Sequence, residues 1–197
     1  MDTSKLDKID LKLADKLHID PEVCSIINDG KRRILIVDLD QHDKSNIHQV
    51  ENMSGKISAY VIKPKSKLFK TFEYRSIGEL HYKFTREHGI PSFQVKGMIA
   101  DNYGMQRELI NALENKICKI NQDGYEYVLC SSIRTHSSHE EFLYSIGYEQ
   151  PYFASYDLDD YVTVYNRNVK PHECENNIKA FYDDAFGTTY NDASEKN

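Results

Sequence analysis

The chain has 197 residues and a formal net charge of −6; 40% of its residues are hydrophobic and 28% are charged. This composition is ordinary for a globular protein, and the length suits one domain with a substantial core. The acidic balance argues against broad nonspecific binding to nucleic acid, and no apolar run approaches the ~20 residues that cross a bilayer. We therefore expect neither a membrane span nor general nucleic-acid binding.

Two helices are predicted in the first 30 residues. The apolar residues of the first helix recur at helical spacing and are Leu6, Ile9, Leu13 and Leu17. Thr3 or Ser4 can cap this helix. Pro21 stands in the first turn of a second helix, which we expect to end near Gly30. These helices are expected to cover one face of a sheet.

The next part of the chain predicts several strands. Arg33 to Asp40 (RILIVDLD) is strongly apolar and reads as a central strand. Lys56 to Lys63 and Leu68 to Tyr74 are predicted as two further strands, joined by a turn that contains Pro64. Leu80 to Phe84 is predicted as another.

The pattern that organises the chain begins at Phe93. Apolar and polar residues alternate from Phe93 to Asp101, which is typical of a strand with two different faces. One predicted face comprises Phe93, Val95, Gly97 and Ile99. A turn over residues 101–104 then leads into a helix with apolar residues at helical spacing, which is expected to end near Gly124.

The second half of this pattern repeats the order of strand and helix. Tyr125 to Ser131 is predicted as a strand, and Ser137 or Ser138 can cap the helix that follows. Tyr161 to Arg167 is predicted as a last strand. Together the elements indicate an α+β fold: a mixed, mostly antiparallel central sheet flanked by helices.

We expect a single domain over residues 1–187. Residues 1–30 would form its helical N-terminal part, residues 93–148 its core and residues 171–187 a C-terminal helix. The polar tail, 188–197, is expected to be disordered.

The turn after the strand has a chemical use. The first backbone N–H groups of a helix have no internal partner, and the helix dipole adds partial positive charge there, which suits a phosphate group. Gly104 lacks a Cβ, so an anion can approach the backbone closely. Most turns of this kind bind nothing, so the turn alone assigns no ligand.

The turn reads DNYGMQ over residues 101–106, Leu109-Ile110 follow it in the predicted helix, and residues 143–148 read LYSIGY. In these motifs, about half of the chain resembles the Gcn5-related N-acetyltransferase (GNAT) superfamily. In that family a strand passes through a Gln/Arg-x-x-Gly-x-Gly/Ala turn into a long helix, and a later helix closes on a Tyr-x-x-Leu-Gly-Phe-like sequence. Residues 101–106 (DNYGMQ) lie on that turn, with Leu109-Ile110 at the family's paired leucines. Residues 143–148 (LYSIGY) lie on the closing signature, and residues 161–167 resemble the family's final strand.

The resemblance implies an acyl-CoA N-acyltransferase-like fold and acetyl-CoA as co-substrate. The pantetheine arm would run along the strand, the pyrophosphate would lie over the turn, and the two parallel strands flanking Gly104 would splay apart. Arg107 is the cation placed to help bind phosphate. The implied coenzyme-binding residues are Met98, Ile99, Ala100, Tyr103, Gly104, Met105, Gln106, Arg107 and His136.

The same resemblance implies the catalytic groups. An attacking amine must be neutral, so a base should remove its proton, and Glu79 and Glu73 are the better-placed carboxylates. The leaving thiolate needs an acid, for which Tyr144 is the candidate. Strict register places Leu143 at that position, and one residue along a helix turns a side chain by about 100°. The acceptor would be an amine-bearing small molecule or protein, and a homodimer stays open.

Three alternatives compete with this interpretation. Asp38 and Asp40 follow an apolar strand, which resembles the paired carboxylates of the Mg²⁺-dependent haloacid-dehalogenase phosphatases. His136 and His139 have a spacing compatible with metal ligands, although loop histidines are the expected explanation and no metal site is predicted. The chain can also be a non-catalytic, acyltransferase-like interaction module.

Cysteine usage and the N-terminal sequence predict a cytoplasmic protein. The cysteines lie at Cys24, Cys118, Cys130 and Cys174, without a Cys-x-x-Cys pair. Such scattering is typical of reduced thiols that pack as small hydrophobic side chains. The first ten residues lack the apolar region of a signal peptide.

Overall fold

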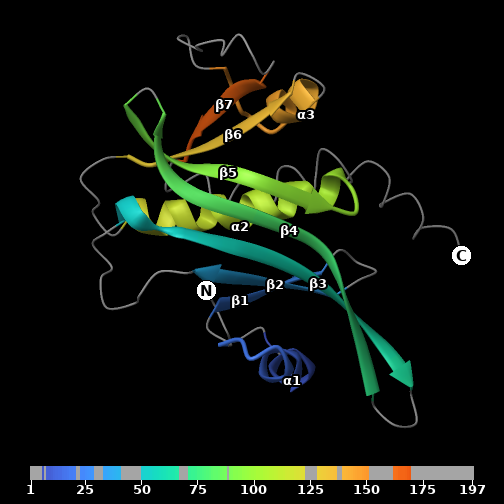
Figure 1. The fold of residues 1–197 in the computed structure, drawn as a ribbon. Helices are drawn as coiled ribbons and strands as arrows, with labels where there is room; N and C mark the ends of the chain where they lie inside the picture. The colour runs from blue at the N-terminus through green and yellow to red at the C-terminus, as the bar shows by residue number, and fades with distance from the viewer. Residues whose placement is uncertain are drawn as a thin grey trace, which may run out of the picture.

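The fold is built around one seven-stranded sheet in which the strands follow chain order, β1 to β7 (Figure 1). It is seen in a computed structural model, which describes residues 6, 8–20, 23–28, 33–40, 50–66, 71–87, 89–122, 128–136, 139–150 and 162–169. The strands are β1 (Cys24–Asn28), β2 (Arg33–Asp40), β3 (Ser54–Ser66), β4 (Thr71–Glu87), β5 (Ile90–Ala100), β6 (Cys130–His136) and β7 (Val162–Asn168). The helices are α1 (Lys8–Lys16), α2 (Tyr103–Gln122) and α3 (Glu140–Ser145), with a 3-10 turn η4 (Val50–Asn52).

Neighbouring strands are antiparallel except β5 and β6, which are parallel and joined through α2. A parallel pair needs such a crossover, whereas antiparallel neighbours need only a turn. The expected mixed, mostly antiparallel sheet flanked by helices is therefore confirmed.

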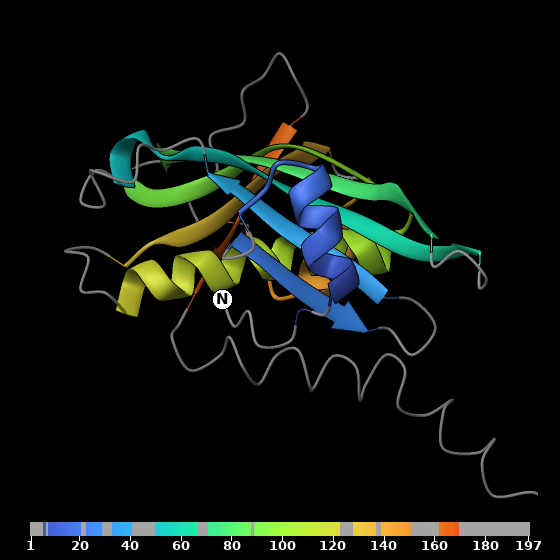
Figure 2. The same cartoon turned by 90° about the horizontal axis from the view of Figure 1, so that it is seen from below.

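The two long faces of the sheet carry separate apolar clusters. The central helix α2 covers one face, where Leu109, Ile110 and Leu113 are fully buried against β2 to β6. The N-terminal helix α1 covers the other face over β1 and β2 (Figure 2). There Leu13 is buried with Leu35 of β2, which alternates in direction with its α2-facing neighbours.

One predicted helix is wrong. The helix expected to run from Pro21 to Gly30 is replaced in the described residues by strand β1, which pairs in register with β2. Ile26 and Ile27 are β-branched, and β-branched side chains suit a pleated sheet better than a helix. Pro21 itself lies outside the described residues, as do Thr3 and Ser4, while the first predicted helix is confirmed as α1.

Strand boundaries also differ from the prediction. The strands expected before and after residue 78 are one continuous strand, β4, in which Ile77 is an extra residue opposite β3. Because the strand continues through this β-bulge, Gly78 lies within β4 and not between two strands as the sequence pattern suggested. Strand β6 begins at Cys130 and continues through a polar segment, because β5 and β7 both pair with it. Its predicted start at Tyr125 lies outside the described residues.

The C-terminal half follows the predicted order. The helix α3 has His139 at its N-cap, not Ser137 or Ser138, and His139 makes no side-chain capping bond. The last predicted strand is confirmed as β7. The predicted helix at 171–187 and the tail at 188–197 lie outside the described residues. Within the described part of the chain, no helix has the length and apolar character of a membrane span.

Candidate functional site

The parallel strands β5 and β6 separate part-way along their length. They pair over four positions, from Ser92 with Cys130 to Val95 with Ile133. Beyond that point β5 continues to Ala100 while paired with β4, and β6 continues to His136 while paired with β7. In Figure 1 the two strands diverge toward α3. We call the space between their diverging ends the wedge.

A β-bulge marks the point of separation. Gly97 pairs with His81 and Val95 pairs with Tyr82, so Lys96 is an extra residue on β5. A bulge bends its strand and increases the local twist, which carries the end of β5 away from β6. It also reverses the side chains, because Phe93 and Val95 are buried under α2 whereas Ile99 is 79% exposed. The predicted face that joined all four of these alternating positions is therefore wrong beyond Val95.

Helix α2 begins at the end of β5. Its first residue is Tyr103, so Tyr103 and Gly104 belong to the first helical turn and not to a preceding loop. The Oδ1 atom of Asn102 accepts a hydrogen bond of 2.9 Å from the N–H of Met105, which makes Asn102 the N-cap. The N–H of Gln106 donates to the carbonyl oxygen of Asn102 at 3.1 Å.

The start of α2 contacts helix α3 directly. The ring of Tyr103, which is 59% exposed, lies 5.2 Å from the ring of Phe142 between centroids. Since α2 follows β5 and α3 follows β6, this aromatic pair joins the two elements that the diverging strands lead into. The first turn of α2, with Gly104 exposed, is thus held beside the wedge.

The implied coenzyme-binding residues divide into two groups. Ile99, Tyr103 and Gly104 are exposed. The partly or fully buried residues are Met98, Ala100, Met105, Gln106 and Arg107. The Oε1 atom of Gln106 is buried without a hydrogen-bond partner. His136 is the last residue of β6, opposite Val162, and its side chain lies outside the described part.

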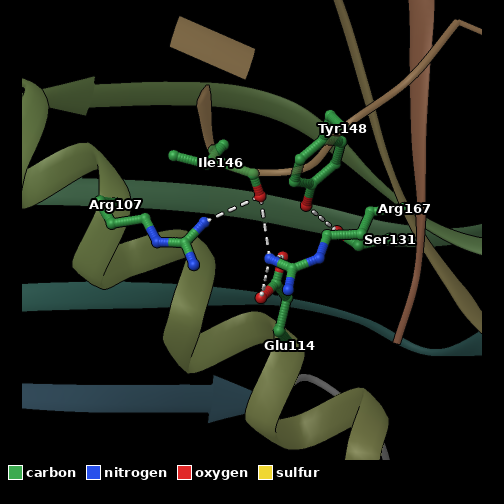
Figure 3. A network of polar contacts seen from close by, with 6 residues as sticks. All are labelled: Arg107, Glu114, Ser131, Ile146, Tyr148 and Arg167. Carbon is green, nitrogen blue, oxygen red and sulfur yellow. Dashed lines mark hydrogen bonds and ion pairs between the residues drawn. The ribbon is translucent and has the colours of Figure 1, made fainter. Parts of the chain in front are cut away.

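Arg107 does not lie where the sequence placed it. Its side chain is 4% exposed and donates to the carbonyl oxygen of Ile146 at 3.3 Å (Figure 3). Burial lowers the pKa of its guanidinium, against the opposing effect of Glu114. Because the guanidinium points into the protein, Arg107 is not available to a phosphate at the mouth of the helix.

Arg107 belongs to a polar network that fixes the Ile-Gly-Tyr sequence after α3. Arg167 of β7 donates to the same Ile146 oxygen at 3.0 Å and to the carboxylate of Glu114 at 3.1 and 3.2 Å. The hydroxyl groups of Tyr148 and Ser131 lie 2.5 Å apart. Burial raises the pKa of Glu114 and raises that of Tyr148 well above its ordinary value. These groups hold the end of α3 against α2, β6 and β7 (Figure 3).

The sequence prediction missed the buried roles of Glu114, Tyr148 and Arg167. A signal for one of them was present, because Arg107 and Glu114 share the helical stripe of Ile110 and Ile117 on α2.

Tyr144 lies on the outer side of α3. Its side chain is 46% exposed, and its ring meets that of Tyr165 edge-on, with 5.9 Å between centroids. The neighbouring Leu143 is 2% exposed and packs in the core. The structure thus retains the register that separates these two positions by about 100°.

The two candidate bases lie at different distances from the wedge. Glu79 of β4 pairs with Ile99 of β5, in the part of β5 that has left β6. Glu73 is exposed and pairs with Lys63 near the far end of the β3–β4 hairpin, about 20 Å further along the strand at the usual rise per residue. Only Glu79 is therefore placed beside the wedge.

The phosphatase alternative is not supported. The carboxylate of Asp38 is buried, accepts a hydrogen bond of 3.0 Å from Tyr82 and lies 2.8 Å from the Nζ atom of Lys116. This pairing leaves Asp38 with neither the access nor the free oxygens that a nucleophile needs. The side chain of Asp40 lies outside the described residues. Among the side chains that are described, no group of three His, Cys, Asp or Glu residues could hold a metal ion.

Comparison with known proteins finds similar solved structures but no matching sequence. No family model matches the chain, and no curated protein matches its sequence. Its structure is similar to the crystal structure of a proposed acyl-CoA N-acyltransferase from Klebsiella pneumoniae subsp. pneumoniae MGH 78578. The two are 16% identical, the match covers 69% of this chain and 97% of that chain, and the TM-score is 0.39. A likeness at this level carries no argument about function.

Proposed function

We propose that the protein is an N-acyltransferase that moves an acyl group, in the first instance acetyl, from acyl-CoA to an amine. The observation that carries the proposal is the wedge between β5 and β6, which pair over four positions and then diverge. A divergence inside a sheet leaves main-chain groups on the facing sides of two strands without a strand partner. Such groups can bind the amides of a pantetheine arm.

The chemistry of acyl transfer fits the same strand. The thioester carbonyl gains negative charge in the transition state, and a backbone N–H directed at it stabilises that charge. In the proposed complex the thioester lies against β5 between Met98 and Ala100, just beyond the bulge. The exposed side chain of Ile99 lies on the face of the sheet opposite α2, so it does not occupy the proposed position of the thioester.

The start of α2 is the proposed site for the pyrophosphate. The exposed first turn of the helix offers partial positive charge next to the wedge, and Gly104 permits close approach. The N–H of Met105 already donates to the side chain of Asn102, so the coenzyme would accept hydrogen bonds from the N–H groups that precede Met105. Arg107 takes no part, because it is buried in the network around Ile146.

Binding of acetyl-CoA tests the proposal. We expect acetyl-CoA to raise the melting temperature of the purified protein and to bind with measurable heat in isothermal titration calorimetry. Gly104→Glu should weaken this binding at least about tenfold, or ~1.4 kcal/mol, because its carboxylate would lie beside the pyrophosphate. A Cβ atom at position 104 would lie 3.2 Å from the Oδ1 atom of Asn102, which a small shift of that exposed side chain relieves. Glutamate in a first helical turn is otherwise compatible with the helix, so the fold should persist.

The matched control is Gln122→Glu, which adds the same charge at the exposed far end of α2. It should leave binding unchanged. Absence of any melting shift at millimolar acetyl-CoA, or an equal loss of binding in both variants, would contradict the proposed site.

A non-catalytic acyl-CoA-binding module is the second candidate. The position of Tyr144 favours it, because the residue that the GNAT resemblance assigns as the acid is 46% exposed and packs its ring against Tyr165 of β7. Release of free CoA thiol in the presence of an amine distinguishes the two candidates: the transferase releases thiol, whereas the module binds coenzyme without turnover.

A further inference from the structure

A charged cluster lies on the face of the sheet opposite α2. It comprises Lys56 of β3 with Glu79 and His81 of β4, and we call it the Lys56–Glu79–His81 cluster. The Oε2 atom of Glu79 lies 3.1 Å from the Nζ atom of Lys56, and its Oε1 atom lies 2.5 Å from the Nε2 atom of His81. All three side chains are partly exposed, so solvent or a substrate can reach them.

The cluster stands beside the diverging part of β5. Glu79 pairs with Ile99, and His81 pairs with Gly97, immediately after the bulge at Lys96. Because the bulge reverses the side chains of β5, Gly97 and Ile99 share the face of the cluster. A Cβ atom built on Gly97 would have no neighbour within 4 Å, so the surface next to His81 is open.

Hydrogen bonding fixes which nitrogen of His81 can accept a proton. Since a carboxylate can only accept a hydrogen bond, the Nε2 atom of neutral His81 carries the hydrogen that is donated to Glu79. The Nδ1 atom then has the lone pair. The hydrogen bond from His81, followed by Lys56, holds the pKa of Glu79 below its usual value. Glu79 therefore stays a carboxylate wherever imidazole titrates.

We propose that His81 is the general base of the acyl transfer, with Glu79 as the residue that positions it. This inference rests on the proposed N-acyltransferase function and adds to it a base that the sequence analysis did not name. It also implies that the acceptor binds on the face of the sheet that carries the cluster. The acceptor is then an amine that binds in its protonated form.

The proposed step balances as follows. The Nδ1 atom of His81 takes one proton from the acceptor ammonium, directly or through a water. The neutral amine forms a C–N bond to the thioester carbon, and the C–S bond breaks. The thiolate of CoA takes the second amine proton, and imidazolium returns the first proton to solvent. Charged groups that lie nearby on this face include Lys83 of β4, Lys96 of β5 and the exposed Arg134 of β6.

Two amine probes with acetyl-CoA test the role of His81. Ethylamine is protonated at neutral pH and needs a base, whereas hydroxylamine is already neutral. In the full chain, His81→Gln should lower kcat for ethylamine by about 10²- to 10⁴-fold and for hydroxylamine by much less. The ratio of the ethylamine rate to the hydroxylamine rate should therefore fall sharply in His81→Gln, which separates the loss of a base from damage to the whole site.

Glu79→Gln tests positioning. It should change the nitrogen chemical shifts of the His81 ring in an NMR spectrum and move the pH profile for ethylamine, with a smaller loss of kcat than His81→Gln. The control is Lys83→Gln, an exposed residue on the same face, which should keep both rates.

The outcomes separate the two proposals. If the unaltered protein fails to bind acetyl-CoA, the proposed function fails. If acetyl-CoA binds but His81→Gln retains ethylamine turnover, or loses turnover of both probes equally, the role of His81 as base is overturned.

Discussion

The carbonyl oxygen of Ile146 accepts hydrogen bonds from two buried or half-buried arginines, Arg107 and Arg167. A lone buried guanidinium is costly, and Glu114 supplies the negative charge that compensates for it. The three side chains come from α2 and β7, and they converge on the turn after α3 (Figure 3). The network therefore holds the C-terminal part of the sheet and α3 in place beside the wedge.

Removal of the compensating charge should be strongly destabilising. Glu114→Ala is expected to lower the free energy of unfolding by about 3–5 kcal/mol, because it breaks a largely buried ion pair with Arg167. Urea denaturation measures the change. The control is Glu51→Ala, which removes the exposed ion pair with Arg86 and should cost less than about 1 kcal/mol. Equal effects of the two substitutions would show that the network contributes no more than a surface pair.

For individual residues, the sequence predicted position along the chain better than the direction of the side chain. Gly104 and Ile99 lie beside the wedge, as their places in the motif suggested. Arg107 was expected to be exposed near the phosphate because it lies in the first turn of the predicted helix. Its helical stripe is apolar, however, and the partners Ile146 and Arg167 are distant in sequence, so only the folded chain brings them to it.

The cap of α2 links the stability of one element to the proposed site. Asn102→Ala removes the hydrogen bond to the N–H of Met105 and should lower the free energy of unfolding by about 1 kcal/mol, within the usual range of ~0.5–2 kcal/mol. Asn102→Asp keeps the cap, because a carboxylate accepts the same bond. Its added charge should instead weaken acetyl-CoA binding at the first turn of the helix.

Denaturation and calorimetry on the two variants together check this separation. The alanine variant should lose stability, and the aspartate variant should lose affinity at nearly unchanged stability. If Asn102→Asp binds acetyl-CoA as well as the unaltered protein, the phosphate does not lie at this end of α2.

Helices and strands were predictable where a local sequence pattern determines them. Predictions were unreliable where pairing with a neighbouring strand determines the structure. The period of α2 and the apolar run of β2 identified both. The bulge at Lys96 left no trace in the alternation of β5, since it depends on how β4 pairs across from it. Likewise, the polar sequence of β6 becomes a strand because it is paired on both sides.

The whole molecule should lose stability in alkaline solution. Burial raises the pKa of the Cys24 thiol to about 11, with smaller contributions from Asp20 and Asp10, and raises the pKa of Tyr148 well above its ordinary value. Both groups keep their protons in the folded state while the unfolded chain releases them above about pH 8.5 for Cys and pH 10 for Tyr. Their contribution is therefore fully present below those values and is lost as pH rises through the folded-state pKa values.

The free energy of unfolding, measured by urea denaturation across alkaline pH, checks this expectation. Cys24→Ala and Tyr148→Phe should each reduce the slope of stability against pH, whatever they cost at neutral pH. Tyr103→Phe, which alters an exposed ring, should leave the slope unchanged. A slope that none of the buried-residue variants alters would contradict the assignment.

The fold class was within reach of the sequence because the order of strand and helix patterns restricts the topology. Successive strands favour antiparallel neighbours, and the predicted strand–helix–strand order at residues 93–131 favours one parallel pair. Two features could not be predicted from the sequence: the side of the sheet that each helix covers, and the point where β5 and β6 separate. Both depend on packing between distant segments.

The late position of the parallel pair along the chain has a kinetic consequence. Strands β2 to β5 each pair with the strand before them, so β1 to β5 can assemble as hairpins with little loss of chain entropy. Val95 meets Ile133 only after the whole of α2 has been laid down, which is a non-local closure and the slower kind of step. A nascent chain would thus reach a nearly complete sheet before it had any place for a coenzyme. Acyl-CoA would bind only after β5 and β6 have paired, so it would stabilise the folded protein without directing its assembly.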